Sequence, residues 1–248
     1  MVKLEDLSFE KSVIETGYHI ALPFSLDYFT DNGRIEIISY SFCVEIAEEF
    51  ENKYSDDPFS AEARRFLYEK LSPLMESLDY DSNNAADRVH FEYRAPAGLT
   101  DLSHGICEII DSLDDEKYED LPLDEFEFDP DDPCDRMAIV RRDGRIVCYA
   151  GLNDICEDDG AYEITVECEA AYRNNGYGKT CVNALARHII ENGGNVKYVC
   201  TSENNASQKT AEAAGLRLYK KCLPFVCYKI QPADAEWDEH FRDFHAEP

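Results

Sequence analysis

Apolar and polar residues alternate along residues 1–85 with both strand-like and helical spacing. Short apolar runs at 18–22 and 34–39 flank Asp31-Asn32-Gly33, a sequence typical of a turn, and predict two strands. Two later stretches repeat apolar side chains every three or four residues and predict amphipathic helices: Phe42, Ile46 and Phe50, then Leu67, Leu71, Leu74 and Leu78. Pro73 is expected to bend or break the second helix. No catalytic motif stands out in this mixed α+β extension.

Residues 86–230 show a more regular succession of apolar strands and amphipathic helices. Asp143-Gly144 is the dipeptide that a two-residue β-hairpin prefers. Glycine ends the two later helices, at 193–194 and at 215. Helices are predicted at 102–110, 179–191 and 206–214, and strands at 88–94, 136–142, 145–153, 162–168, 196–201 and, in two pieces broken at Pro224, over 216–230. The order of these elements predicts an α+β domain.

The last residues, 231–248, form a third segment. Trp237, Phe241 and Phe244 lie at positions i, i+4 and i+7, which predicts an amphipathic helix. Such a helix would dock on the body of the protein or on a second copy of the chain, so a homodimer is one of two alternatives.

Composition limits the partners of the chain. Among 248 residues, 24 are Lys or Arg and 52 are Asp or Glu, which gives a formal net charge of −28. Because like charges repel, neither nucleic acid nor an anionic membrane is expected to bind. With 44% hydrophobic residues the chain is predicted to fold. Since no apolar run approaches the roughly 18 residues of a membrane span and no secretory signal is present, a cytoplasmic protein is expected.

The cysteines and histidines do not form a metal-binding pattern. The ten cysteines are scattered without a C-x-x-C pair, and the six histidines lack metal-ligand spacing. We therefore expect reduced cysteines that pack in the core, and no metal site. Cys168 and Cys200 could suggest a covalent acyl-enzyme, but burial in an apolar strand makes a thiol a poor nucleophile, and packing is the favoured interpretation.

Charge is distributed unevenly along the chain. Twelve acidic residues and one basic residue lie between positions 111 and 132, and such a run is usually a solvated loop. By contrast, residues 170–230 hold nine basic and three acidic residues. A basic region in so acidic a chain predicts an anionic ligand.

A glycine-containing turn lies inside this basic region, between a predicted strand and a predicted helix. Gly176 and Gly178 allow a tight bend, and the helix that follows presents unpaired N–H groups and a partial charge of about +0.5. Such a turn suits a phosphate group. It is neither a dinucleotide fingerprint, because the third glycine position holds Cys181, nor a P-loop.

Two motifs resemble those of one family. Arg173-x-x-Gly176-x-Gly178 at the start of a helix resembles the pyrophosphate loop of the GNAT superfamily of acetyl-CoA-dependent N-acetyltransferases, and residues 164–172 resemble the strand that enters it. Asn204, followed by Ser207 and by Gly215-Leu216, is similar to the second signature of that family, with Leu216 in place of the usual Phe.

The resemblance covers residues 86–230 and implies a fold and a cosubstrate. The fold would be a GNAT-type mixed, splayed central sheet flanked by helices, with residues 1–85 as an N-terminal α+β extension of unknown role. The cosubstrate would be acetyl-CoA.

The resemblance also implies which residues hold the coenzyme. Backbone groups of Val166 and Cys168 would pair with the pantetheine arm as if it were an added strand, and Asn204, with Ser207 in the same signature, would bind the arm from the other side. Thr180 would cap the pyrophosphate. The pyrophosphate would lie on backbone N–H groups of the turn: Arg173, Asn174, Asn175, Gly176, Tyr177, Gly178 and Lys179.

The implied reaction is attack by an amine on a thioester, which needs a base, an oxyanion donor and stabilisation of the departing thiolate. A backbone N–H near Cys168 would be the oxyanion donor. Strand alternation places Glu163, Thr165, Glu167 and Glu169 on one face. We predict Glu163 as the base, because a base in this family often lies upstream on this strand, with Glu167 as second candidate. A polar, exposed strand face is the competing interpretation.

One position departs from the family pattern. A Tyr that serves as general acid often lies seven residues after the Asn, where this chain has Ala211. Tyr198, Tyr219 and Tyr228 are the candidates to replace it, or the thiolate leaves without a tyrosine.

The resemblance thus implies an N-acetyltransferase for a small-molecule or peptide amine, cationic if the acidic run attracts it. The alternative is a CoA-responsive GNAT-fold binding or interaction module without turnover.

Overall fold

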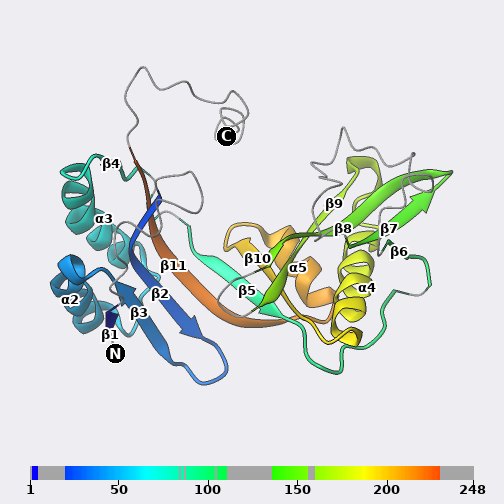
Figure 1. Ribbon diagram of the computed structural model, residues 1–248, viewed down its shortest axis with the longest axis horizontal. Coiled ribbons are helices and arrows are strands. Elements are labelled where there is room, and N and C mark those ends of the chain that lie inside the picture. Colours follow the sequence, from blue (N-terminus) through cyan, green and yellow to red (C-terminus); the bar gives the residue numbers. More distant parts are fainter. Residues whose placement is uncertain are drawn as a thin grey trace, which may run out of the picture. The chain divides into compact units, whose positions relative to one another are not determined.

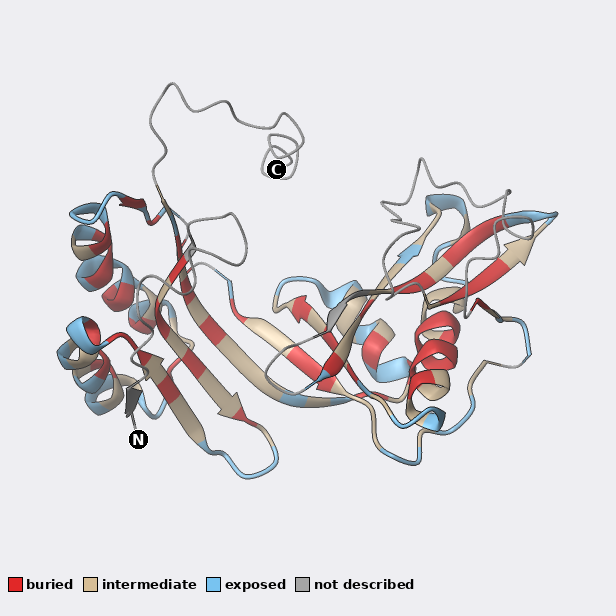
Figure 2. Cartoon of the chain, viewed as in Figure 1, coloured by how far each residue is buried: buried red, intermediate tan, exposed pale blue. Residues whose placement is uncertain are grey.

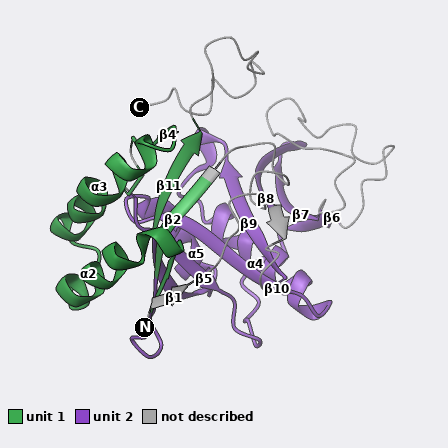
Figure 3. Ribbon diagram, turned by 60° about the vertical axis from the view of Figure 1, so that its left-hand side comes forward, with its two compact units in different colours: residues 1–26, 36–87, 224–248 green, residues 27–35, 88–223 purple. Residues whose placement is uncertain are grey.

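The computed structural model describes residues 2–4, 20–83, 85–86, 88–103, 105–110, 136–155 and 160–229. The chain divides into two compact units (Figure 3). Unit 1 comprises residues 1–26, 36–87 and 224–248, and unit 2 comprises residues 27–35 and 88–223. The acidic run at 111–132 and the helix expected near the C-terminus lie outside the described residues.

Unit 1 combines short strands with two helices (Figure 1). The helices α2 and α3 carry the two predicted apolar faces, and Phe50 of α2 packs on Phe24 with ring centroids 5.0 Å apart. Phe42 precedes α2 and is 46% exposed, and Leu78 follows α3 and is 37% exposed, so neither belongs to its predicted face. The elements are β1 (Val2–Leu4), β2 (Ile20–Phe29), β3 (Ile35–Ser39), η1 (Ser41–Cys43), α2 (Val44–Tyr54), α3 (Ala61–Glu76) and β4 (Tyr80–Asp81).

Pro73 does not break α3. The helix runs three residues past it, to Glu76. A proline in a helix removes one N–H bond to the carbonyl four residues earlier, here that of Glu69. Because Glu69 is exposed, water can bind that carbonyl.

Unit 2 is a mixed sheet flanked by helices, as the sequence predicted. Its strand order is β11-β5-β10-β9-β8-β7-β6, with β9 and β10 parallel and the other neighbours antiparallel. The elements are β5 (His90–Arg94), β6 (Glu108–Ile110), β7 (Met137–Arg142), β8 (Arg145–Ile155), β9 (Ala161–Cys168), η2 (Ala170–Tyr172), α4 (Tyr177–Glu191), β10 (Asn195–Thr201), α5 (Asn205–Ala213) and β11 (Arg217–Lys229), whose residues from Pro224 on belong to unit 1.

The hairpin between β7 and β8 is confirmed. Asp143 and Gly144 both adopt positive φ angles, 52° and 82°, as a tight two-residue turn requires.

Two predictions in this unit are wrong. Residues 102–110 do not form a helix, because Gly105 has a φ of 67° and 108–110 pair with β7 instead, which buries Ile110. The stretch 216–230 is not broken into two strands, because β11 runs through Pro224. Its residues up to Cys222 pair with β5 and its last two pair with β4, so Pro224 falls between these two paired stretches, while the other neighbour of β11 is β2.

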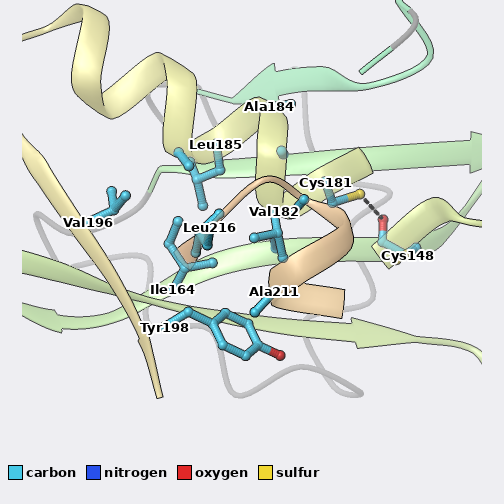
Figure 4. Close-up of a cluster of buried hydrophobic side chains, with 14 of the residues drawn as sticks. Cys148, Ile164, Cys181, Val182, Ala184, Leu185, Val196, Tyr198, Ala211 and Leu216 are labelled. Carbon is cyan, nitrogen blue, oxygen red and sulfur yellow. Dashed lines mark hydrogen bonds between the residues drawn. The ribbon is translucent and has the colours of Figure 1, made fainter. Parts of the chain in front are cut away.

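The core of unit 2 lies under α4 and α5. Figure 2 shows the buried face of α4, and Figure 4 shows Val182, Leu185 and Leu216 packed around Ile164 of β9. None of the helices in the described part of the chain has the length and apolar character that a membrane crossing needs.

A buried asparagine ties α4 to its surroundings. Asn183 is fully buried; its Oδ1 accepts the Leu102 N–H at 2.8 Å, and its Nδ2 donates to the carbonyls of Thr100 and Ala214, both at 2.9 Å. These bonds hold the 100–102 segment and the C-terminal end of α5 to the middle of α4.

We expect Asn183→Leu to lower the free energy of unfolding by about 3 kcal/mol, because one N–H and two carbonyls would lose their buried partner. Urea denaturation measures the change. Asn192→Ala is the matched control, since the exposed Asn192 side chain donates only to the His188 carbonyl, and a change within about 0.5 kcal/mol is expected. Equal losses in the two variants would contradict this role of Asn183.

Candidate functional site

The parallel strands β9 and β10 separate along their length. They pair only where Ala161–Glu163 face Asn195–Lys197. On their outer edges, β9 stays paired with β8 as far as Cys168, and β10 stays paired with β5 as far as Thr201. The inner edges beyond Glu163 and Lys197 therefore form an open gap, and Glu163 marks its closed end.

Hydrogen bonding on the other side of β9 shows which backbone groups face this gap. The Glu169 N–H donates to the Val147 carbonyl at 3.0 Å, so Glu169 directs its backbone groups away from the gap. Since these directions alternate along a strand, Val166 and Cys168 direct their N–H and C=O groups into it. The Cys168 carbonyl accepts a bond from Arg173 Nε at 3.0 Å. The gap thus offers an extended ligand a strand edge to pair with.

The glycine-containing turn follows β9 and leads directly into α4. Asn174 and Gly176 have left-handed φ angles of 64° and 81°. Gly176 is the N-cap of α4 and has no side chain to satisfy the first N–H groups of the helix. From β7, Arg142 Nε donates to the Tyr177 hydroxyl at 2.9 Å, which anchors the first helical residue. The first N–H groups of α4 are therefore open to a ligand, and the Arg142–Tyr177 bond fixes their position.

Gly178 lies between β9 and α5. A Cβ at this position would lie 3.6 Å from Thr210 Cγ2 and 3.7 Å from Val166 Cγ2, which are ordinary contact distances. The fold itself therefore accepts a side chain the size of alanine here. We infer that the glycine serves the approach of a ligand to the backbone.

The remaining turn residues are placed as follows. Thr180 is buried, and its hydroxyl donates to the Gly176 carbonyl at 2.8 Å, so it supports the turn; its role as a phosphate cap stays a prediction. Asn175 donates to the Tyr172 carbonyl at 3.0 Å. Arg173 is exposed and Lys179 is half-buried.

The second motif forms the N-terminus of α5. Asn204 is the N-cap, and its Oδ1 accepts the Ser207 N–H at 3.0 Å. This bond leaves the Asn204 side-chain NH₂ group to donate to a ligand.

Glu163 pairs with a lysine at the closed end of the gap. Its Oε2 lies 3.2 Å from Lys197 Nζ, and the two side chains are 28% and 15% exposed. Glu167 lies further along the same face and lines a pocket of about 350 Å³ with Arg145 and Arg173. The structure does not bring the two glutamates together.

The Cys168 and Cys200 thiols are poor nucleophiles. A hydrogen bond to Cys148 and burial raise the pKa of Cys168, and burial raises the pKa of Cys200. Cys148 lies directly opposite Cys168 in the sheet, and Cys107 Sγ is 3.8 Å from Cys181 Sγ. No group of three or more His, Cys, Asp or Glu side chains within the described ranges could hold a metal ion.

Sequence reasoning missed the ion pairs of the basic region. Besides Lys197, Arg187 pairs with Asp101 at 2.8 Å and Lys220 pairs with Asp27 at 2.7 Å. These three cations are balanced by carboxylates, two of them far away in the sequence. The charge pattern therefore overstated how many cations are directed at a ligand.

A family model described as the acetyltransferase (GNAT) family matches residues 104–216. That range contains the gap, the glycine-containing turn and the Asn204 motif. The match to the GNAT acetyltransferase family covers a little under half of the chain. Comparison with curated proteins finds no match.

Solved structures similar to this chain include GNAT-family proteins. One from Novosphingobium aromaticivorans is 16% identical, with 57% of this chain and 65% of that chain covered and a TM-score of 0.45. An acetyltransferase from Colwellia psychrerythraea is 12% identical, with 56% of each chain covered and a TM-score of 0.42. A Salmonella typhimurium structure with acetyl-CoA as its cofactor is 18% identical, with 40% and 67% covered and a TM-score of 0.31. The alignments thus span less than two thirds of the first two relatives.

Within residues 104–216, Gly178 of the predicted turn lies near Val166 of β9 and Thr210 of α5, and Asn204 is the N-cap of the same helix α5. Glu163 lies at the closed end of the gap and the turn adjoins its open end.

Proposed function

We propose that this chain is an N-acetyltransferase that transfers an acetyl group from acetyl-CoA to a primary amine by direct attack. The observation that carries the proposal is the gap between β9 and β10, which is open along the edge of β9 and ends at the uncapped N-terminus of α4. An extended arm that ends in a pyrophosphate fits both parts of this site.

The residues present fit the coenzyme. The gap-facing groups of Val166 and Cys168 would pair with the pantetheine arm, and the Asn204 NH₂ group would donate to the arm from α5. The N–H groups at the start of α4 would bind the pyrophosphate, aided by the partial positive charge of the helix end.

Proton removal from the amine is assigned to Glu163, directly or through a water molecule. The helices cover the face of the sheet that carries Ile164, so an acceptor would approach from the face that carries Glu163. A backbone N–H near Cys168 is the proposed oxyanion donor on the same strand.

The acceptor is proposed to be a cationic small molecule or peptide. The acidic run at 111–132 just precedes β7, and exposed carboxylates attract cations over about 8 Å at physiological ionic strength. We therefore expect kcat/KM to fall as salt is added, and steady-state rates from 20 to 500 mM salt measure it. A neutral or acidic amine as best substrate, with no salt dependence, would refute a cationic acceptor.

Release of free coenzyme A thiol from acetyl-CoA tests the proposal. Thiol should appear faster when a panel of primary amines is added, and the acetylated amine should be detected by mass. Binding of acetyl-CoA without amine-dependent thiol release would instead favour a CoA-responsive module without turnover.

A further inference from the structure

Tyr198 lies at the closed end of the gap. It is the first residue of β10 beyond the last pair with β9, Lys197 with Glu163. Its side chain is 3% exposed and belongs to the core under α4 and α5. Figure 4 shows its ring beside Ala211 of α5, which is fully buried. A side chain from β10 thus occupies space that a larger residue at 211 would need.

The Tyr198 phenol carries one O–H group that can donate a hydrogen bond while it stays protonated. Burial raises the pKa of Tyr198, despite the opposing effect of a hydrogen bond with Ser207. The phenol is therefore protonated at neutral pH.

Other tyrosines in the described part of the chain are placed differently. Tyr219 is 38% exposed and stacks edge-on against Phe29. Tyr228 is 47% exposed and lies in unit 1. Tyr93 already donates to Glu212 at 3.5 Å.

Glu163 and Tyr198 project from opposite faces of the sheet at the same end of the gap. Glu163 pairs with Lys197 on the face away from the helices, and Tyr198 packs in the core on the helix face. An amine that attacks the thioester from the face away from the helices would meet Glu163. A sulfur that departs toward the helix face would meet Tyr198.

We propose that Tyr198 donates a hydrogen bond to the departing sulfur of the coenzyme. This inference rests on the proposed acetyl transfer. Glu163 takes the ammonium proton, and the amine nitrogen then forms a bond to the acetyl carbon. The C–S bond breaks with its electron pair on sulfur, and the second proton of the nitrogen passes to solvent as the amide forms. The sulfur leaves as a thiolate held by the Tyr198 O–H, and takes a proton from solvent on release.

The thiol of bound coenzyme A reports this bond without any acceptor. A donor that stabilises the thiolate lowers the thiol pKa, so Tyr198→Phe should raise the pKa of the bound thiol by about one unit. The ultraviolet absorbance of the thiolate, followed against pH, measures it. Binding of desulfo-coenzyme A, which lacks the sulfur, should be unchanged, because a purely structural defect would weaken both ligands. Tyr219→Phe should change neither.

The outcomes separate this inference from the proposed function. If coenzyme A binds to the wild type and its thiol pKa is the same in Tyr198→Phe, the assignment of Tyr198 is wrong while the coenzyme site stands. If neither coenzyme A nor desulfo-coenzyme A binds to the wild type, the proposed function fails and this inference with it. With an active amine in hand, Tyr198→Phe should lower kcat by roughly tenfold to a hundredfold.

Discussion

Replacing Gly178 by Asp is expected to abolish the stabilisation that acetyl-CoA gives to the folded chain. For the wild type, ligand at 100 times its Kd stabilises by about 2.7 kcal/mol, which should raise Tm by several degrees. Asp at position 178 adds both bulk and negative charge beside N–H groups proposed to bind pyrophosphate. Thermal melts with and without acetyl-CoA measure the difference.

Gly178→Ala and Gly176→Ala provide matched controls. The ordinary contact distances around Gly178 predict that Gly178→Ala keeps the melting temperature of the unliganded chain and loses part of the ligand shift. Gly176 has a φ of 81°, so Gly176→Ala should lower the unliganded melting temperature through backbone strain. An undiminished ligand shift in Gly178→Asp would show that the coenzyme binds elsewhere.

Glu163→Gln is expected to lower kcat by roughly 10² to 10⁴ if Glu163 removes the ammonium proton. Coenzyme affinity should barely change, because the proposed coenzyme contacts are largely backbone groups. The defect should shrink as pH rises toward the pKa of the amine, since more acceptor then arrives deprotonated. Steady-state kinetics from pH 6.5 to 10 measure both effects.

Glu167→Gln is the control variant for Glu163→Gln. Glu167 lies on the same face of β9 but away from the closed end of the gap, so full activity is expected. If Glu167→Gln loses activity while Glu163→Gln keeps it, the base is Glu167, further along the same strand face, and not Glu163. If neither variant is impaired, the glutamates form only a polar strand face.

The sequence predicted the elements whose signal is local. Asp143-Gly144 specified the hairpin, and the glycine-containing turn marked the start of α4, because both depend on backbone angles that few residues adopt. Pairing over long distances left no such signal. Residues 108–110 are too short a run to be distinguished from a helix, and only their pairing with β7 makes them a strand. The continuity of β11 through Pro224 likewise depends on a change of partner strand.

The candidate site divides in the same way. The glycine-containing turn and the Asn204 motif are each a short continuous stretch of the sequence, so each could be predicted from it. The ion pair of Glu163 with Lys197 joins residues 34 positions apart and appears only once β9 and β10 pair. Asn183 was missed because its three bonds reach two segments that the sequence does not connect to α4. Tyr198 was one of three candidates until the structure placed it at the gap.

Amide hydrogen exchange along β9 tests the central claim, that acetyl-CoA lies in the gap as an added strand. On addition of acetyl-CoA, residue-resolved exchange measured by NMR should slow at Val166 and Cys168, whose N–H groups face the gap. It should change little at Thr165 and Glu167, whose N–H groups bond to β8 before the ligand arrives. No slowing at Val166 and Cys168, with saturating acetyl-CoA bound, would contradict the account.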